Sequence, residues 1–374
     1  MVSSSRRAIR LAWALALGAL WAACAKPSID SPTPGEPLDG EVRLFHFDVG
    51  QADATLVWGP DGTILIDAGD WRASDVVPHL EAVGVESIDL LILTHPHADH
   101  IGQVPAVLRE FEVREVWMSG WEHPSQTFER VLDAVLLSDA GYFEPRSGDS
   151  HTLGDLRVEV LHPVFPLEDV HDNVAVRVRF GNFAAVYTGD AEVEHEREMI
   201  ERHGPELQAQ LLQLGHHGSR TSSSLEFLQA VSPEIAIYSA AEDSQYNHPH
   251  DEVVARIQSL GIPLYGTAQS GTIVVTADGE GDYSIQELGR GGESSPIHRV
   301  EEEAPAKVDE ECIDINRADA SELERIAHTG PARAEQIIEQ RPFRSIAELE
   351  RVPGLGEARV RDIEQEGLAC VKSP

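Results

Sequence analysis

Thr94-His95-Pro96-His97-Ala98-Asp99-His100 is the stretch that decides the fold, because it gathers three histidines and an aspartate within six residues. It directly follows Leu90 to Leu93, a continuous apolar run that predicts a strand buried on both faces. Pro96 keeps the segment out of a helix, so a tight loop at the end of the strand presents the four side chains. Imidazole and carboxylate ligands suit Zn²⁺, and Mn²⁺ or Fe²⁺ also fit. The loop therefore predicts a site for divalent cations.

Segments on both sides of this loop alternate between strand and helix patterns. Ala54 to Trp58 and Thr63 to Asp67 flank the turn Gly59-Pro60-Asp61-Gly62 and predict a hairpin. This alternation predicts a layered α/β domain over residues 41–287. The other expected elements are strands at Glu41–Asp48, Ala184–Tyr187 and Ile235–Tyr238, and helices at Ser74–Val83 and His250–Leu260.

The His-rich loop resembles the HxHxDH signature of the metallo-β-lactamase superfamily. The resemblance extends over residues 41–287 and is closest to the hydrolase domain of ComEC-type DNA-uptake proteins. It implies an αβ/βα sandwich that holds two divalent ions, zinc by preference, with manganese or iron as alternatives. The other segments that carry it are Phe47–Ala54, Ile66–Gly69, Tyr187–Asp190, Leu214–Ser219 and Tyr246–Pro249.

The resemblance also implies a set of metal ligands. Two residues are candidates for the third ligand of metal one. His171 precedes Asp190 by about the number of residues that is usual in the superfamily. Asn173 matches an asparagine of the ComEC-like branch and is favoured as a site residue. Asp67 is expected to support the ligand loop by hydrogen bonds, or else to form a turn before Gly69. The assigned ligands are His95 and His97 for metal one, Asp99, His100 and His248 for metal two, and Asp190 between the metals.

Two such metals would activate a water molecule and neutralise an anionic substrate. For a phosphodiester, His217 or His216 is expected to protonate the leaving oxygen or to hold a phosphoryl oxygen. The residues expected to take part in catalysis are thus Asp99, His216, His217 and Asn173. Members of the superfamily that hydrolyse β-lactams use a cysteine ligand, and residues 41–287 contain no cysteine, which argues against that substrate class.

Residues 312–370 contain an internal repeat with an offset of 26 residues, in which Leu323-Glu324-Arg325-Ile326 recurs as Leu349-Glu350-Arg351-Val352. Each copy predicts two helices joined by a glycine turn, and the segment resembles the small all-α tandem helix-hairpin-helix domain of ComEA-type competence proteins. That resemblance implies contacts to DNA phosphate without base reading, and a role in protein–protein contact is the alternative. Pro331 weakens the first turn because it removes a donor. The residues expected at the DNA are Gly330, Gly354, Gly356, Arg333 and Arg359.

The charge balance limits this DNA contact. The chain has 29 basic and 64 acidic residues and a net charge of −35, so it offers no broad basic face to a polyanion. Residues 309–374 alone hold nine basic and fifteen acidic side chains. Any binding to DNA is therefore expected to be local and weak.

The N-terminus has the pattern of an export signal. Three arginines precede the apolar run Leu11 to Ala23, which is too short for a permanent membrane span. The run ends at Cys24 in a segment that resembles a bacterial lipobox, so residues 1–24 predict a lipoprotein-type signal peptide, or else a plain secretory one. A Pro-rich spacer at 25–40 and a linker at 288–311 separate the parts of the chain. These patterns predict an extracytoplasmic protein that is tethered by lipid, secreted or periplasmic.

Cys312 and Cys370 flank the C-terminal segment. In an oxidising compartment they are expected to form a disulfide, and two buried free thiols are the alternative.

Together these patterns predict an exported binuclear metallohydrolase, of the phosphodiesterase or nuclease type, that acts on DNA in a competence-like setting with DNA-uptake proteins as partners. Two alternatives stay open. One is a hydrolase of small phosphodiesters, lactones or esters, and the other is a non-catalytic DNA-binding lipoprotein.

Overall fold

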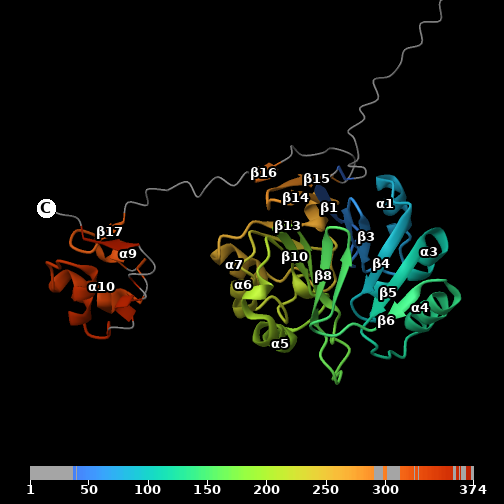
Figure 1. Ribbon diagram of the computed structural model, residues 1–374. Helices are drawn as coiled ribbons and strands as arrows, with labels where there is room; N and C mark the ends of the chain where they lie inside the picture. The colour runs from blue at the N-terminus through green and yellow to red at the C-terminus, as the bar shows by residue number, and fades with distance from the viewer. Residues whose placement is uncertain are drawn as a thin grey trace, which may run out of the picture. The chain divides into compact units, whose positions relative to one another are not determined.

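The structure of the protein is a computed structural model (Figure 1). The structure describes residues 37–38, 40–289, 298–300 and 312–371, the last range without 324, 327, 357–358, 362 and 364–367. These residues divide into two compact units, residues 1–299 and residues 300–374. The predicted signal peptide with Cys24, most of the spacer and most of the linker lie outside the described residues.

Unit 1 is built on two sheets. The first sheet contains the predicted hairpin, since β2 pairs antiparallel with β3, and then continues through parallel pairs from β3 to β6. Its strand order is β16 (His298–Val300), β15 (Tyr283–Glu287), β14 (Ile273–Asp278), β1 (Glu41–His46), β2 (Thr55–Gly59), β3 (Gly62–Ile66), β4 (Ser87–Leu93), β5 (Glu112–Met118) and β6 (Gly141–Phe143).

The second sheet likewise joins an antiparallel half to a parallel half. Strands β7 to β10 pair antiparallel, and β10 to β13 pair parallel. Its order is β13 (Leu264–Gly266), β12 (Ile235–Tyr238), β11 (Leu211–Gln213), β10 (Phe183–Tyr187), β9 (Ala175–Phe180), β8 (Leu156–His162) and β7 (Ser150–Leu153).

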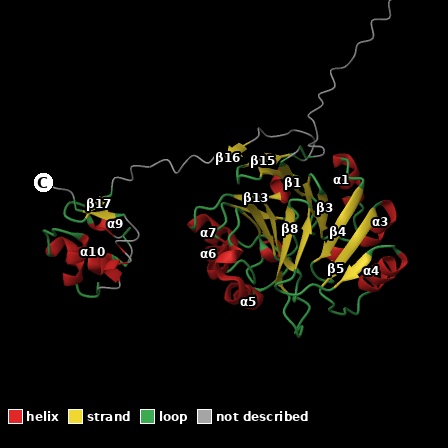
Figure 2. Ribbon diagram, in the orientation of Figure 1, coloured by secondary structure: helices red, strands yellow, loops and turns green. Residues whose placement is uncertain are grey.

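Helices cover the outer face of each sheet, which gives a four-layer sandwich (Figure 2). The first sheet packs against α1 (Val76–Val83), α3 (Val104–Glu110) and α4 (Gln126–Leu137) through one apolar cluster. The second sheet packs against α5 (Val193–His203), α6 (Leu225–Val231) and α7 (Asp251–Ser259) through another. Shorter elements are α2 (Ala98–Ile101), α8 (Thr267–Ser270), η1 (Gly204–Leu207) and η2 (Gly215–Gly218).

A third apolar cluster lies between the sheets. It joins side chains of the first sheet, such as Leu44 and Ile64, to side chains of the second, such as Val176 and Phe183. Leu90 to Leu93 of β4 are all buried because this strand packs against the second sheet on one face and against helices on the other. The predicted αβ/βα sandwich is therefore confirmed.

Unit 2 is a small helical body with its own core. Its elements are β17 (Ile313–Asp314), α9 (Ala320–Leu323), α10 (Pro331–Glu339), η3 (Ile346–Arg351) and β18 (Ala369–Cys370). Leu323, Ile326 and Ile337 of the first repeat pack in one cluster with Leu349, Val352 and Ile363 of the second. A disulfide joins Cys312 to Cys370, next to the parallel pair of β17 and β18.

In the described part of the chain, no helix is both long enough and apolar enough to cross a bilayer.

Candidate metal centre

The candidate site lies where strands of both sheets end. In the first sheet, Asp67 follows β3 and the His-rich loop follows β4. In the second, Asp190 follows β10, His216 and His217 follow β11, and the chain before β9 supplies the loop from His171. The carboxyl ends of parallel neighbours meet at one edge, and the fold brings together possible ligands that are up to 164 residues apart in sequence, as Asp53 and His217 are.

The first group of possible metal ligands comprises His95, His97 and Asp190. His95 Nε2 lies 3.0 Å from His97 Nδ1 and 3.5 Å from Asp190 Oδ2. The Thr94 hydroxyl donates to Asp67 Oδ2 and lies 3.1 Å from His95 Nδ1, so it accepts the Nδ1 hydrogen. This arrangement leaves the lone pair of His95 on Nε2, which faces the other two ligands.

His171 lies beside this group. Its ring centroid is 5.6 Å from that of His97 and 6.2 Å from that of His95. The structure thus brings His171 next to the ligands of metal one, as expected of a third ligand.

The second group comprises Asp53, His100, Asp190 and His217, all buried. His100 Nδ1 is 2.8 Å from Asp67 Oδ2, and His217 Nδ1 is 3.0 Å from the Ser239 carbonyl oxygen. Each imidazole donates through Nδ1, so its Nε2 keeps a lone pair for a metal. His100 Nε2 lies 3.3 Å from Asp190 Oδ1, and His217 Nε2 lies 3.4 Å from Asp99 Oδ2.

The four members of this group fit a bound cation. Each holds a buried atom without a hydrogen-bond partner among the described residues: Asp53 Oδ1, His100 Nε2, Asp190 Oδ1 and His217 Nε2. Buried polar atoms are normally paired, and unpaired donor atoms gathered around one point are what a metal requires. Imidazole and carboxylate ligands of this kind suit zinc, and also manganese or iron.

His217 and His248 lie at different depths in the site. His217, expected to act on the substrate, is almost completely buried and belongs to the ligand group. His248, expected as a ligand of metal two, is not in that group and instead lines a cavity of about 410 Å³. The Gln51 side-chain amide lies 3.3 Å from His248 Nδ1 and fixes the ring there. The left-handed backbone at His217 in η2 directs the His217 side chain toward Asp190, and His217 Nε2 lies 3.9 Å from Asp190 Oδ1.

Asp99 lies at the boundary between the metal group and this cavity. Its Oδ2 is 4.0 Å from His100 Nε2, and its side chain is 29% exposed, so it can contact both a metal and a substrate. The cavity is also lined by His97, His123 and His216.

Asn173 is bound to backbone at both polar ends, and its expected part in catalysis stays a prediction. Its Oδ1 accepts from the Asp190 backbone amide at 3.0 Å, and its Nδ2 donates to the His171 carbonyl. Both polar ends of this fully buried side chain are engaged by backbone, so it holds the loops that carry Asp190 and His171.

Asp53 was missed at the sequence level. It lies in the segment Phe47–Ala54 that carries the family resemblance. No histidine or other acidic residue lies within three residues of Asp53, unlike in the His-rich loop. The tertiary structure brings it near His217, with Asp53 Oδ1 3.7 Å from His217 Nδ1. Burial raises the pKa of Asp53 to about 6, and the neighbouring histidines act against that rise.

Buried carboxylates of the second group favour positive charge at that group. Burial lowers the pKa of His217, but Asp53 and Asp190 outweigh it and raise that pKa to about 9. His97 and His248, by contrast, have pKa values of about 4, chiefly because they are partly buried. The carboxylates of Asp53 and Asp190 are therefore placed to attract cations.

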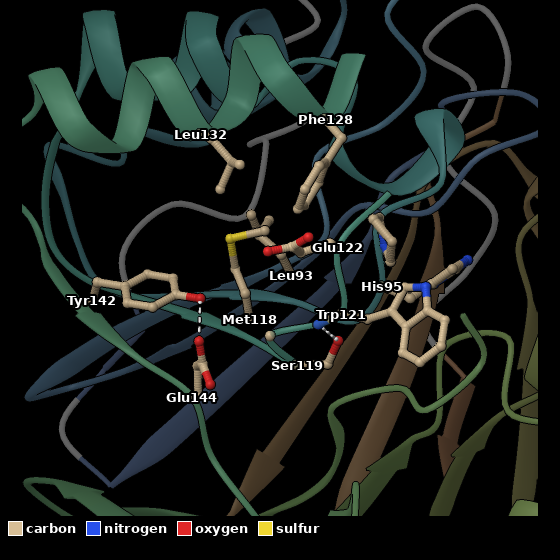
Figure 3. Close-up of a pocket in the computed structure, with 12 residues that line it drawn as sticks. Leu93, His95, Met118, Ser119, Trp121, Glu122, Phe128, Leu132, Tyr142 and Glu144 are labelled. Carbon is tan, nitrogen blue, oxygen red and sulfur yellow. Dashed lines mark hydrogen bonds between the residues drawn. The ribbon is translucent and has the colours of Figure 1, made fainter. Parts of the chain in front are cut away.

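A second, mostly apolar recess of about 170 Å³ lies on the other side of His95. Figure 3 shows Met118, Leu132 and Phe128 around it, with the Tyr142 hydroxyl bonded to Glu144 at 3.0 Å. The loop after β5 supplies Ser119 to Glu122, and β4, β5, β6 and α4 supply further residues, so the recess belongs to the first sheet's side of the site.

In unit 2, the repeat gives two equivalent turns. Arg333 Nη1 donates to the His328 carbonyl oxygen, and Arg359 Nη1 donates to that of Gly354, each five residues earlier. Gly354 has φ +88°, a backbone conformation that favours glycine, and Gly330 caps α10. The arginines expected at DNA thus brace the turns whose backbone amides are expected to contact phosphate.

Family models match both units of the chain. A family model described as metallo-beta-lactamase superfamily matches residues 47–242, and one described as helix-hairpin-helix motif matches residues 308–366. Among solved structures, the metallo-beta-lactamase fold protein YhfI from Bacillus subtilis is similar with a TM-score of 0.45 and 16% identity, over 63% of this chain and 100% of that one.

Curated relatives include competence proteins. ComE operon protein 3 of Bacillus subtilis (strain 168) is 32% identical over 257 residues, which are 63% of this chain and 33% of that protein. Competence protein ComA of Neisseria gonorrhoeae is 30% identical over 287 residues, 75% of this chain and 37% of that protein. The chain thus spans about a third of the length of these relatives. On these matches, the chain belongs to the metallo-beta-lactamase superfamily and carries a C-terminal helix-hairpin-helix domain.

Proposed function

We propose that this protein is an exported, metal-dependent phosphodiesterase that cleaves DNA, and that its helix-hairpin-helix domain holds the DNA by the backbone. The observation that carries the proposal is the set of buried, unpaired ligand atoms beside a cavity that is open to a substrate. The DNA assignment is supported by the relatives named as competence proteins and by the helix-hairpin-helix match.

The proposed ligands follow the two groups. One cation would be held by His95, His97 and Asp190, with His171 as the third imidazole. The other cation would be held by His100, Asp190 and His217, together with Asp53 or Asp99. Two cations held there would supply a hydroxide at neutral pH and Lewis acidity toward a phosphoryl oxygen.

His248 is proposed to act on the substrate in place of His217. The Gln51 amide donates to His248 Nδ1, so the neutral ring carries its hydrogen on Nε2. His248 lines the same cavity as Asp99, and its Nε2–H is available to donate to a phosphoryl oxygen or to a leaving oxygen. His216, which is partly exposed in the same cavity, is a second contact for the phosphate.

One assay tests the activity. Residues 25–374 are purified, loaded with Zn²⁺ or Mn²⁺, and offered single-stranded DNA, bis-p-nitrophenyl phosphate and a lactone. We expect cleavage of DNA and of the phosphodiester, abolished in Asp99→Ala and retained in Asp61→Ala, whose side chain lies in an exposed turn. Binding of DNA without any turnover would overturn the enzymatic proposal.

The acidic surface favours a second candidate, a hydrolase of small phosphodiesters, lactones or esters. A net charge of −35 repels a long polyanion but acts less on a small substrate. Turnover of the small substrates with no cleavage of DNA at any ionic strength would select this candidate.

Export and a lipid tether at Cys24 are part of the proposal. They are supported by the arginines and apolar run before Cys24 and by the disulfide between Cys312 and Cys370, which is typical of oxidising compartments. Mass spectrometry of the mature N-terminus checks them: a diacylated Cys24 is expected, and a chain that keeps residues 1–23 would contradict export.

A further inference from the structure

Another cavity, with a volume of about 400 Å³, adjoins the cavity beside the metal centre and is called the outer cavity below. The two cavities meet along the residues that line both of them, which are Gln51, Ala98, Asp99 and Tyr246. The loop after β3 lines the outer cavity alone, through Asp70, Arg72 and Ala73. Asp99 thus lies between the candidate metal ligands and the outer cavity.

The two cavities together offer more space than a small phosphodiester needs. Each of them alone falls within the range of about 300–1,000 Å³ that is typical of sites for small ligands. A compound with one phosphate at the metal centre would occupy the first cavity and leave the outer one free. A nucleotide chain cleaved at the metal centre would continue into the outer cavity.

Arg72 brings positive charge to the outer cavity. Among the described residues that line the two cavities, it is the only arginine or lysine. Its side chain is 71% exposed, its Cζ lies 5.1 Å from the centre of the Trp71 ring, and its Nη1 lies 3.5 Å from Asp70 Oδ2. So exposed an ion pair is weak, and the guanidinium is therefore available to bind a phosphate. In a chain with a net charge of −35, this local charge favours a polyanion at one place only.

Tyr246 presents an aromatic ring to both cavities. The residue is 54% exposed, and its ring stacks on that of His248 with the centroids 5.7 Å apart. Ser244 holds the loop, because its Oγ accepts from the backbone amides of Tyr246 and His248 at 3.3 and 3.2 Å. An exposed aromatic ring on a loop that is held in this way offers a surface on which a nucleobase stacks.

We propose that Tyr246 stacks an unpaired base of the substrate and that Arg72 binds the phosphate next to the one at the metal centre. This proposal rests on the proposed function and narrows its substrate to single-stranded DNA. The faces of a base in a duplex are covered by its neighbours, so Tyr246 would reach such a base only after it had left the stack.

Binding of a short oligonucleotide tests the contact to Tyr246 without depending on turnover. The probe is a fluorescent tetrathymidylate, and its anisotropy is measured with the Zn²⁺-loaded mature chain in the Asp99→Ala background. We expect Tyr246→Leu to weaken binding by about 5- to 150-fold, as for the loss of one stacked base, and Tyr246→Phe to bind like the background. Phe165→Leu is the control, since it removes a ring that is 76% exposed and lines neither cavity. Equal affinity in Tyr246→Leu and the background overturns the stacking contact.

The salt dependence of the same binding tests the contact to Arg72. We expect Arg72→Ala to weaken binding and to reduce the slope of log affinity against log salt by about 0.7, as for one phosphate contact to a single strand. Arg114→Ala is the matched control, because Arg114 is 66% exposed, pairs with Asp89 at 2.7 Å and lines neither cavity. An unchanged slope in Arg72→Ala overturns the phosphate contact.

Turnover by the chain with Asp99 intact separates this proposal from the proposed function. Methyl p-nitrophenyl phosphate has one phosphate and no base, so we expect Tyr246→Leu and Arg72→Ala to hydrolyse it like wild type while their KM for tetrathymidylate rises. A wild-type KM for tetrathymidylate in both variants contradicts this proposal alone. Absence of turnover with every substrate contradicts the proposed function, and the binding measurements then decide this proposal. A long duplex cleaved as fast as its separated strands would contradict the need for an unpaired base.

Discussion

Asp67 controls the orientation of the ligand loop at the scale of single residues. Its Oδ1 accepts from the Thr94 backbone amide at 2.8 Å, and its Oδ2 accepts from the Thr94 hydroxyl and from His100 Nδ1 at 2.8 Å each. These hydrogen bonds tie Asp67 to the His-rich loop. Because Asp67 itself has φ +59°, its backbone is held in a conformation that costs free energy unless such contacts stabilise it.

We predict that Asp67→Asn lowers the metal affinity of the centre by about 10- to 100-fold, because His100 loses its carboxylate partner. Competition with a fluorescent chelator measures the affinity, and Asp61→Asn is the control. An unchanged affinity in Asp67→Asn would show that the loop does not need this carboxylate.

His46 gives the protein a defined sensitivity to acid. It is buried on β1, its ring stacks on Tyr187, and burial lowers its pKa to about 3. In the unfolded chain the ring takes up a proton below about pH 6.5, whereas in the folded chain it stays neutral. The unfolded state is therefore favoured progressively as the pH falls from about 6.5 toward 3.

We predict that His46→Phe reduces this loss of stability. Between pH 6.5 and 4.5, the free energy of unfolding of wild type should fall by up to about 1.4 kcal/mol per pH unit more than that of the variant. Urea titrations with EDTA present measure it without a contribution from bound metal. Parallel pH curves for the two proteins would show that His46 is not the responsible group.

At the scale of elements, helix α2 is positioned through backbone contacts. Gly102 ends this helix, and its amide donates to the Gly69 carbonyl at 2.8 Å. A Cβ at Gly102 would come within 2.0 Å of the Trp71 backbone nitrogen and 2.5 Å of the Ala98 carbonyl oxygen. The helix that carries Asp99 and His100 thus depends on a residue without a side chain.

We predict that Gly102→Ala lowers the free energy of unfolding by at least about 2 kcal/mol and also weakens metal binding, because α2 must move. Gly141→Ala is the control, since its Cβ would meet nothing nearer than 3.5 Å. Chemical denaturation and metal titration measure both quantities. A variant as stable as Gly141→Ala would contradict the close approach at Gly102.

At the scale of the whole molecule, the proposed hydrolysis belongs to unit 1 and the proposed binding of DNA to unit 2, and each unit has its own core. The disulfide Cys312–Cys370 closes a separation of 58 residues around unit 2. We predict that Cys312→Ser/Cys370→Ser lowers the stability of this unit by up to roughly 4 kcal/mol in the chain-entropy model, while hydrolysis of bis-p-nitrophenyl phosphate is unchanged. Thermal unfolding and the assay check the two halves of the prediction, and loss of the hydrolysis would mean that the units are coupled.

Removal of residues 309–374 tests the division of work directly. We predict that the shortened chain has a higher apparent KM for DNA and an unchanged KM for the small phosphodiester, because the paired turns supply phosphate contacts only. Steady-state kinetics at two salt concentrations measures both. An unchanged KM for DNA would count against the tethering role.

The sequence by itself determined the alternation of strands and helices, the hairpin of β2 and β3, the His-rich loop and the repeat in unit 2. These features are local, since strand and helix periodicity and ligand spacing lie within short segments. Only the tertiary structure decided the positions and contacts of Asp53, Asn173, His217 and His248. Their positions depend on the left-handed backbone at η2 and on packing between sheets whose strands are distant in sequence.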